Sequence, residues 1–526
     1  MTAQQTISQT DRLVSFGKIY GFLKYYHPHV AKGKFDWDKE FFKYLPKVIK
    51  ATDKESLSSI YINWIESLGE IKKCKKCDLN DTFFDKNFDL DWLQDATIFN
   101  TELSSRLKYI EANRNQGDNY YASTHSAGNI KITNEPTYDN FEYPNEDYRL
   151  LGLFKYWNII EYFYPYKYLT DQNWDAVLKE MIPKIRNATH KNAYQSTLKE
   201  LIAKLDDSHA WIMFNERPKY KYLPVKITHV EDKAVIFKYY NDSLAIMNNL
   251  KLGDAILKIN GKTIEAELAK NLKYVSGSNK NFKILKAFEK IFNGPEESLE
   301  LTLEREGQIE QIIANKYEFS SFRYLENKRV ITSKSITEAI GYINMSSRFT
   351  EKEFDNIFES FKTKSYIIVD LRGYPEFKYK MFTKYFNLEK RNFAIIYKPN
   401  ISYPGKYITD KYLETGYSRK AFKGNFILLV NEDSLSLSEF TAMAFQTTAN
   451  IITIGNQTTG ADGDVVSFKY LGGFNTGISG IGVLYPDGSE SQRTGVKIDI
   501  EVKPTRNGLK QGRDEILEKA IEIAKQ

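Results

Sequence analysis

The chain has 526 residues, of which 42% are hydrophobic and 27% charged, an ordinary composition for a folded globular protein. Its 74 basic and 68 acidic residues leave a net charge of only +6, and no basic run indicates nucleic-acid binding. No stretch of 18 apolar residues could span a membrane, and the first residues, MTAQQTISQTDRL, lack the pattern of a signal peptide.

The N-terminal part contains an internal repeat. RLVSFGKIYGFLKYYHP (12–28) aligns with RLLGLFKYWNIIEYFYP (149–165) at an offset of 137 residues, and the same offset aligns Trp37 with Trp174. Both copies carry apolar residues at helical spacing, which predicts a duplicated helical unit.

A chain of this length should divide into several domains. We expect an N-terminal region over 1–146, with the first helical repeat at about 12–70 and a polar segment at 78–146 that forms a few strands and long loops. The second helical repeat should occupy 147–216.

Only the second copy of the repeat continues into the stretch LDDSHAWI (205–212); at the same offset the first copy has GEIK. Ser208 and His209 could cap a helix, or they could belong to a catalytic site. Because the first copy lacks the pair, the helical unit does not require it, and this favours a functional role. We interpret Asp206 and Asp207 as a helix terminus.

The two cysteines, Cys74 and Cys77, form a CxxC motif. No second CxxC or nearby histidine pair completes the four ligands that a structural zinc site needs. A structural pair without redox or metal chemistry is the leading interpretation, and a disulfide or a redox or metal pair are the alternatives. The other histidines show no ligand spacing, so we expect no metal and no cofactor.

From about residue 218 the sequence has the texture of β-structure, with strand patterns at LPVKITHV (223–230) and KAVIFKYY (233–240) and a hairpin turn at INGK (259–262). The stretch NNLKLGDAILKINGKTI (248–264) resembles a PDZ domain, which implies a PDZ-like β domain over 217–318. Such a domain can bind an extended chain end as an added strand. The alternative is a spacer that binds no peptide.

The last part, 319–526, alternates strands and helices, which predicts an α/β core with a sheet rich in parallel strands. SYIIVDLRG (365–373) and NFILLVNED (425–433) are continuous apolar strands, so both faces should be buried. Ligands in such sheets bind beyond the carboxyl ends of the strands.

One of these strand ends leads into SLSLSEF (434–440), where a helix should begin near Ser436. A hydroxyl at a helix N-terminus lies among unpaired N–H groups, where an oxyanion is stabilised. Three serines before a helix can equally be capping residues, and the stretch alone does not decide between these interpretations.

Three segments of the core together resemble the C-terminal processing (tail-specific) serine peptidase family. They are DLRGYP (370–375), the stretch from LLVNEDSLSLSEF to NQTTG (428–460), and GVKIDIEVKPTRNGLKQGRDEILEKAI (495–521). The resemblance implies a crotonase-like ββα catalytic core over 319–526.

The resemblance also implies roles for individual residues. Ser436 corresponds to the nucleophile, and the oxyanion donors are the amide of Leu437 and one from the turn Gly373–Glu376. Within that turn Glu376 is the better donor, because Pro375 has no N–H.

This sequence departs from the family at the base. Most members use a lysine 25 residues after the nucleophile, where this chain has Ala461. The subgroup resembling the tricorn core peptidase instead draws its base from a Ser-His pair, which implies His209 as the base and Ser208 as the residue that orients it. In that subgroup a glutamate positions the serine. Here the matching residue is Gln492, which predicts slow turnover.

The resemblance therefore implies a serine endopeptidase that hydrolyses peptides or unfolded protein chain ends through an acyl-enzyme. It implies a peptide or protein substrate and a setting in the bacterial cell envelope or periplasm, while the charge and hydropathy patterns indicate no nucleic acid and no membrane span. Two alternatives remain: a non-catalytic relative that binds small ligands or peptides, and an acyl-ester hydrolase that uses the same site.

Overall fold

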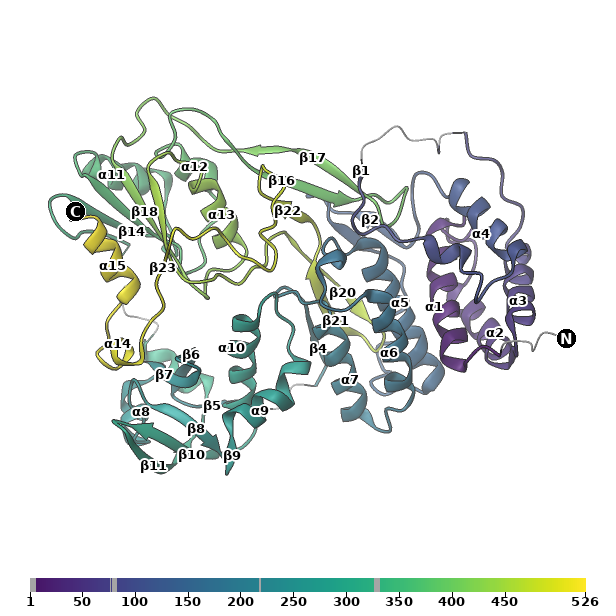
Figure 1. Ribbon diagram of the computed structural model, residues 1–526, viewed down its shortest axis with the longest axis horizontal. Coiled ribbons are helices and arrows are strands. Elements are labelled where there is room, and N and C mark those ends of the chain that lie inside the picture. Colours follow the sequence, from purple (N-terminus) through teal and green to yellow (C-terminus); the bar gives the residue numbers. More distant parts are fainter. Residues whose placement is uncertain (1–5, 76, 78–82, 217–218, 326–331) are drawn as a thin grey trace. The chain divides into compact units, whose positions relative to one another are not determined.

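The computed structural model describes residues 6–75, 77, 83–216, 219–325 and 332–526. These residues belong to two compact units, each assembled from separate stretches of the chain (Figure 1). The first unit comprises Met1–Asn215, Ile396–Lys411 and Gly463–Gly482, and the second comprises Glu216–Ile395, Tyr412–Asp462 and Val483–Gln526. None of the helices in the described ranges is both long and apolar enough to cross a membrane.

The duplicated helical unit is present in the first unit. Three helices recur in the same order, and each helix of the second copy begins 137 residues after its counterpart: α1 (Gln9–Tyr26), α2 (Trp37–Lys50) and α3 (Lys54–Ser67), then α5 (Glu146–Phe163), α6 (Trp174–Arg186) and α7 (Lys191–Ala203). Each begins at a residue whose side chain accepts a backbone N–H, namely Ser8, Asp36, Asp53, Asn145, Asn173 and His190.

The two copies pack through α1 and α5, and most residues of both helices are buried. A Cβ on Gly17 would lie 2.9 Å from the ring of Phe154, and one on Gly21 would overlap the amide of Asn158. At the repeat offset, Gly17 corresponds to Phe154 and Gly21 to Asn158. The copies have therefore diverged to small residues on one helix and larger ones on the other, which lets the backbones approach closely.

The segment between the copies differs from the expectation of strands and loops. It contains a twelve-residue helix, α4 (Thr101–Ala112), capped by Asn100 and buried through Leu103, Leu107 and Ile110. The expected strands are short: β1 (Phe83–Phe84), β2 (Ala122–Thr124) and β3 (Ile130–Ile132). This segment also contains the 3-10 helix η1 (Asp91–Gln94), and a second 3-10 helix, η2 (Lys167–Leu169), lies between α5 and α6 in the second copy.

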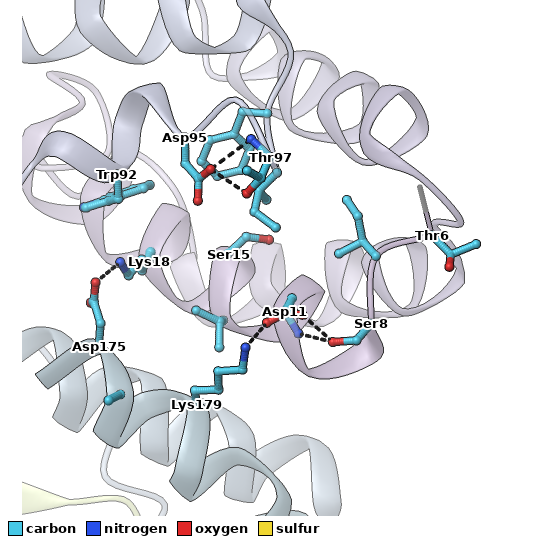
Figure 2. Close-up of a pocket in the computed structure, with 15 residues that line it drawn as sticks. Thr6, Ser8, Asp11, Ser15, Lys18, Trp92, Asp95, Thr97, Asp175 and Lys179 are labelled. Atoms are coloured by element: carbon cyan, nitrogen blue, oxygen red, sulfur yellow. Dashed lines mark hydrogen bonds and ion pairs between the residues drawn. The ribbon is translucent and has the colours of Figure 1, made fainter. Parts of the chain in front are cut away.

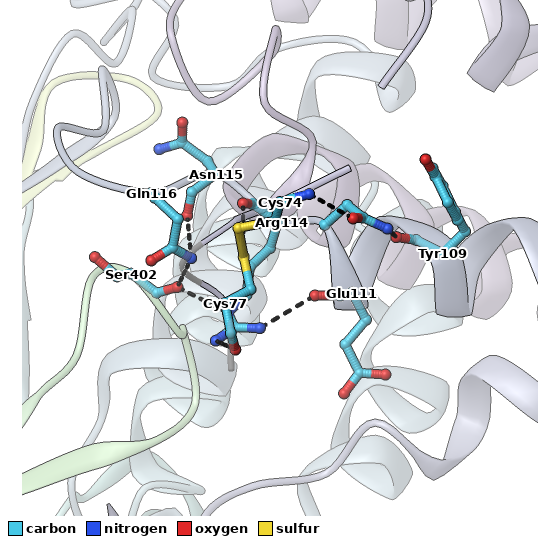
Figure 3. The surroundings of a disulfide bond; sticks show 9 residues. Cys74, Cys77, Tyr109, Glu111, Arg114, Asn115, Gln116 and Ser402 are labelled. Atoms are coloured by element: carbon cyan, nitrogen blue, oxygen red, sulfur yellow. Dashed lines mark hydrogen bonds between the residues drawn. A yellow bond between two sulfur atoms is a disulfide. The ribbon is translucent and has the colours of Figure 1, made fainter. Parts of the chain in front are cut away.

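Cys74 and Cys77 form a disulfide, which was the alternative and not the leading interpretation (Figure 3). Its surroundings hold it against α4 and the following residues. The Cys74 N–H donates to the side chain of Asn113, and Arg114 donates to the carbonyl of Cys77. Arg114 also donates to the Ser402 carbonyl and lies 3.5 Å from the ring centre of Tyr403. The disulfide and these contacts therefore join Cys74 and Cys77 to the end of α4 and to the residues that follow it.

A three-stranded sheet in the first unit joins distant parts of the chain. Its order is β20-β21-β4, all antiparallel, with β20 (Val465–Tyr470) and β21 (Phe474–Ser479) beside β4 (Trp211–Met213). Three further strands contain the boundaries between the units: β16 (Asn392–Pro399), β17 (Tyr407–Glu414) and β22 (Gly482–Leu484). Tyr407 and Ile408, at the start of β17, pair with β1.

The second unit begins with the predicted β-rich part. Its main sheet has the order β11-β10-β8-β7-β6, with β9 paired to β8. Asn260 and Gly261 both have left-handed backbone, as the tight hairpin turn at INGK requires. The elements are β5 (Lys221–Tyr222), β6 (Val225–Val230), β7 (Lys233–Tyr239), α8 (Asp242–Met247), β8 (Ala255–Ile259), β9 (Lys262–Thr263), α9 (Ile264–Asn271), η3 (Leu272–Tyr274), α10 (Lys280–Ile291), β10 (Ser298–Arg305), β11 (Gln308–Asn315) and β12 (Tyr317–Glu318).

The rest of the second unit is the α/β core, and its sheet is rich in parallel strands as expected. The order is β13-β14-β15-β18-β19-β23, and all neighbours are parallel except β13 and β14. The elements are η4 (Phe319–Leu325), β13 (Ser333–Ser335), β14 (Ile340–Asn344), α11 (Glu351–Phe361), β15 (Tyr366–Asp370), α12 (Tyr379–Thr383), β18 (Asn425–Val430), α13 (Leu437–Phe445), β19 (Ile451–Gly455), β23 (Ile500–Glu501), α14 (Arg506–Lys510) and α15 (Glu515–Ile523).

The two apolar strands β15 and β18 are neighbours at the centre of this sheet, and their side chains are buried on both faces. Helix α15 covers one face, because Ile516 and Ala520 belong to the same buried cluster as Ile368, Ile427 and Leu429. Asp370 is paired with Leu429, so the two strands end at the same edge of the sheet. The loops that follow them are consequently neighbours.

Candidate active site

Two loops at the carboxyl edge of the core sheet carry the predicted nucleophile and oxyanion donors. The loop after β15 runs through Gly373 to Glu376, and the loop after β18 leads to Ser436. Hydrogen bonds fasten them together. The Ser434 hydroxyl donates to the carbonyl of Leu371 at 2.9 Å, and the Ser438 hydroxyl donates to the carbonyl of Gly373 at 3.0 Å.

The three serines of SLSLSE thus have different environments. Ser434 and Ser438 are fully buried and bonded to backbone carbonyls, whereas Ser436 is only half-buried. Ser436 precedes α13 with φ of 54° and ψ of −108°, a conformation that is costly for any residue with a side chain. Strain of this kind concentrates where a functional side chain must be presented, and here it places Ser436 at the positive end of the helix.

Glu439, three residues after Ser436, holds this helix start against the loop that follows β19. Its carboxylate accepts the Ser436 N–H at 3.2 Å, the Gly460 N–H at 2.7 Å and the Ala461 N–H at 3.0 Å. The hydroxyls of Thr458 and Thr459 also donate to it. Burial raises the pKa of Glu439, and its hydrogen bonds with Thr458, Ala461, Gly460 and Ser436 oppose that rise. Ala461, at the position of the family lysine, is completely buried.

The predicted oxyanion turn is braced by ion pairs. Arg372 bridges Asp370 and Asp514, the residue that caps α15, with hydrogen bonds of 2.6 to 3.0 Å. These two carboxylates raise the pKa of Arg372 against the effect of its burial. The carboxylate of Glu376 pairs with Lys378 at 2.6 Å, so its charge is largely compensated.

Gln492 lies in the second unit and is buried. Its side-chain oxygen accepts the Asp462 N–H at 3.1 Å, and its nitrogen donates to the Ser278 hydroxyl at 3.4 Å. Gln492 therefore contacts Asp462, which directly follows Ala461, one of the donors that bind Glu439.

His209 lies in the first unit, in the turn between α7 and β4, and is 7% exposed. Its Nδ1 lies 3.0 Å from the Ser479 hydroxyl, which lies 3.1 Å from a carboxylate oxygen of Asp207. Asp207 also accepts the backbone N–H groups of His209 and Ser479 at 3.0 and 2.9 Å. Asp207 and Ser479 are completely buried.

The interpretation of Asp206 and Asp207 as a helix terminus is right for Asp206, whose N–H donates to the carbonyl of Ala203, and wrong for Asp207. Helix α7 ends at Ala203, and Asp207 is instead a hydrogen-bond partner of His209 and of β21. Because a carboxylate accepts only, the Ser479 hydroxyl donates to Asp207 and accepts from His209 Nδ1–H. This arrangement holds the proton on Nδ1 and leaves Nε2 as the basic nitrogen.

Five predicted site residues lie in the second unit, namely Gly373, Glu376, Ser436, Leu437 and Gln492, and two lie in the first, Ser208 and His209. The transfer of a proton between Ser436 and His209, and the orienting role of Ser208, stay predictions. Sequence reasoning missed Ser479 and the role of Asp207. Ser479 is 270 residues from His209 and lies in no motif.

Known proteins resemble this chain in its α/β core. Residues 339–502 match the model of peptidase family S41. No curated protein matches the sequence significantly. Among solved structures, mature CPAF complexed with lactacystin is 14% identical with a TM-score of 0.56, covering 72% of this chain and 97% of that one. At this identity the likeness concerns the fold alone.

Two further solved structures are less similar. The photosystem II D1 C-terminal processing protease is 14% identical with a TM-score of 0.42, covering 70% of this chain and 98% of its own. The tricorn protease is 15% identical with a TM-score of 0.34, covering 75% of this chain and 37% of its own. From the family match and the motifs of its core, residues 339–502 belong to peptidase family S41.

Proposed function

We propose that this chain is a serine endopeptidase that hydrolyses peptides or unfolded protein chain ends through an acyl-enzyme on Ser436. The observation that supports this best is the strained backbone of Ser436 at the start of α13, between two serines that are fully bonded. A hydroxyl needs a base to act as a nucleophile at neutral pH. His209, with its Nδ1 bonded to Ser479, supplies one on this proposal.

The reaction would proceed as follows. His209 Nε2 accepts the proton of the Ser436 hydroxyl as the oxygen attacks the scissile carbonyl, and then donates it to the leaving amine. The oxyanion is stabilised by the N–H groups of Leu437 and Glu376, each worth about 3 kcal/mol in the transition state. Water then attacks the ester through the same base. Ser208 and Gln492 keep the supporting roles that the family resemblance implies.

The proposal includes the domains of the chain. We assign 217–318 to a PDZ-like domain and 319–526 to a crotonase-like core, preceded by the regions 1–146 and 147–216. In the β-rich part, β6 is an edge strand and runs beside α10. A groove of about 100 Å³ lies along them, lined by residues that include Ile227 and Phe288. An extended peptide could add to the open edge of β6 there.

The setting that we propose is the bacterial cell envelope. Disulfides form and persist in oxidising compartments and are rare in the cytosol. The Cys74–Cys77 disulfide is therefore consistent with such a compartment.

The test is covalent labelling of Ser436 by a fluorophosphonate, followed by the intact mass. We expect one label per chain in the wild type and none in Ser436→Ala, with Ser489→Ala, a substitution in an exposed turn, labelled like the wild type. Absence of labelling in the folded wild type would favour a binding protein. Hydrolysis of an activated ester without cleavage of any peptide amide would favour the acyl-ester hydrolase.

The pH dependence follows from the environment of His209. Burial lowers the pKa of His209 below its ordinary 6.5, although the carboxylates of Asp207 and Asp464 oppose this. The base must be neutral, so the acid limb of kcat/KM should lie below pH 6.5. In Asp207→Asn, which removes one opposing charge, the limb should move to still lower pH. A limb above pH 6.5, or one that Asp207→Asn does not move, would count against His209 as the base.

Ser479→Ala tests the alignment of the imidazole. The variant removes the acceptor of Nδ1–H but keeps the Ser479 N–H bond to Asp207, so β21 should stay in place. We expect kcat to fall about 10- to 100-fold with KM nearly unchanged, because the wrong tautomer becomes accessible. The Nδ1–H proton signal in the NMR spectrum should also be lost. Retained kcat with a retained signal would show that another group holds the ring.

A further inference from the structure

A pocket in the first unit is lined by none of the residues of the proposed reaction. It has a volume of about 450 Å³ and lies between α1, α6 and the segment after η1 (Figure 2). Two ion pairs cross it, Lys18 with Asp175 at 2.5 Å and Lys179 with Asp11 at 2.7 Å. Trp92 forms part of the wall, and the Lys18 ammonium lies 5.3 Å from its ring centre.

The internal duplication provides a second copy of this pocket, and that copy is filled. At the repeat offset, Lys18 corresponds to Lys155 and Asp175 to Asp38, and these two also form an ion pair, of 2.7 Å. The pairs are exchanged between the copies, since each joins a lysine of one copy to an aspartate of the other.

The occupant of the filled copy is a segment of the chain itself, residues 133–141. The Tyr138 hydroxyl donates to Asp38 at 2.9 Å, and the Lys155 ammonium lies 5.7 Å from the Tyr138 ring centre. The Tyr138 and Phe141 rings both pack on Tyr148, which corresponds to Asp11 of the open pocket. Tyr148 in turn packs on Phe42, which corresponds to Lys179.

The filled copy therefore shows what a lysine–aspartate pair on this scaffold accepts. The aspartate accepts the hydroxyl of a tyrosine, and the lysine covers the face of its ring. In the open copy Asp175 keeps about a third of its side chain exposed toward the pocket, whereas the Lys18 ammonium already faces the ring of Trp92 in the pocket wall. Ile98 and Phe99 add an apolar wall.

One difference in charge between the two copies limits the specificity of the open pocket. In the filled copy Glu135 is held by both Lys24 and Lys155. The residue that corresponds to Lys24 is Glu161, which carries the opposite charge. The open copy thus lacks the second cation. It should therefore recognise the aromatic ring and hydroxyl of a bound tyrosine, and an acidic residue three positions before that tyrosine should affect binding little.

We propose that the pocket between α1 and α6 binds an extended peptide segment through a tyrosine side chain, as its duplicate binds residues 133–141. The site shares no residue with the proposed reaction, and its occupant would be an unfolded segment of the protein substrate.

The probe is a synthetic peptide with the sequence of residues 133–141, TNEPTYDNF, titrated into the full chain by calorimetry. We expect saturable binding to one site with a dissociation constant of about 1 mM or tighter. Replacing Tyr138 by alanine in the peptide should weaken binding at least tenfold. Replacing Glu135 by glutamine there should change it less than threefold.

A pair of matched variants locates the site. Ala176→Trp fills the open pocket from an exposed position in the first turn of α6, and it should abolish binding. Lys39→Trp places the same side chain at the corresponding exposed position of α2, beside the filled copy, and should leave binding unchanged. No binding of the peptide at several millimolar, or binding that Ala176→Trp does not reduce, would overturn the proposal. Both variants should label at Ser436 like the wild type.

Discussion

Ser436→Ala is expected to remove peptidase activity almost completely, by about 10⁴- to 10⁶-fold in kcat. The alanine keeps the Cα and the N–H that donates to Glu439, so the start of α13 should be unaltered. Its thermal unfolding midpoint should lie within a few degrees of the wild type. The measurement is the initial rate on an unfolded protein substrate at saturation, with the midpoint recorded on the same preparation.

The neighbouring serine provides the matched control. Ser434→Ala leaves the carbonyl of Leu371 and the N–H of Asn431 without their hydroxyl partner in a buried loop. It should cost about 1–3 kcal/mol of stability while retaining measurable activity. Ser436→Ala should thus abolish activity without affecting stability, whereas Ser434→Ala should lower stability and leave measurable activity. Substantial activity in purified Ser436→Ala would place the nucleophile elsewhere.

The fold was predictable from the sequence where its signals are local and repeated. The apolar runs of β15 and β18 required burial on both faces, and the structure places them at the centre of a parallel sheet. The repeat predicted a duplicated helical unit because apolar spacing recurred twice, and the structure has three helices in each copy. Helix α4 escaped prediction because only three of its residues are buried and it lies in an otherwise polar segment.

The candidate site was predictable only where motifs carry it. Ser436 and its loops follow from short patterns around strand ends, where the geometry is set by the nearest strand and helix. The partners of His209 could not be predicted in this way. Ser479 meets His209 because β21 pairs with β4, and no local pattern encodes an antiparallel pairing across more than 250 residues. Residues of that kind are found only once the sheet is known.

The second large effect is expected for Glu439→Gln. Gly460 N–H and the Thr458 hydroxyl donate to one carboxylate oxygen, and the N–H groups of Ser436 and Ala461 donate to the other. In glutamine one of these oxygens becomes an amino group, which cannot accept a hydrogen bond. Either orientation of the amide therefore sets a donor against at least one backbone N–H. Hydroxyls can turn away from such a contact, but backbone N–H groups cannot.

We expect Glu439→Gln to lose about 2–4 kcal/mol of stability in urea unfolding, since a buried, charged acceptor is removed from fixed donors. The Ser436 N–H is one of those donors, so labelling of Ser436 should slow by about 100-fold as the nucleophile loses its position. Glu359→Gln makes the same change on an exposed face of α11, where the partner is Lys362, and should alter neither property. A Glu439→Gln protein as stable as Glu359→Gln but slow to label would mean that the carboxylate aligns Ser436 without supporting the fold. Normal labelling in both would mean that the strained backbone of Ser436 is maintained by the loop alone.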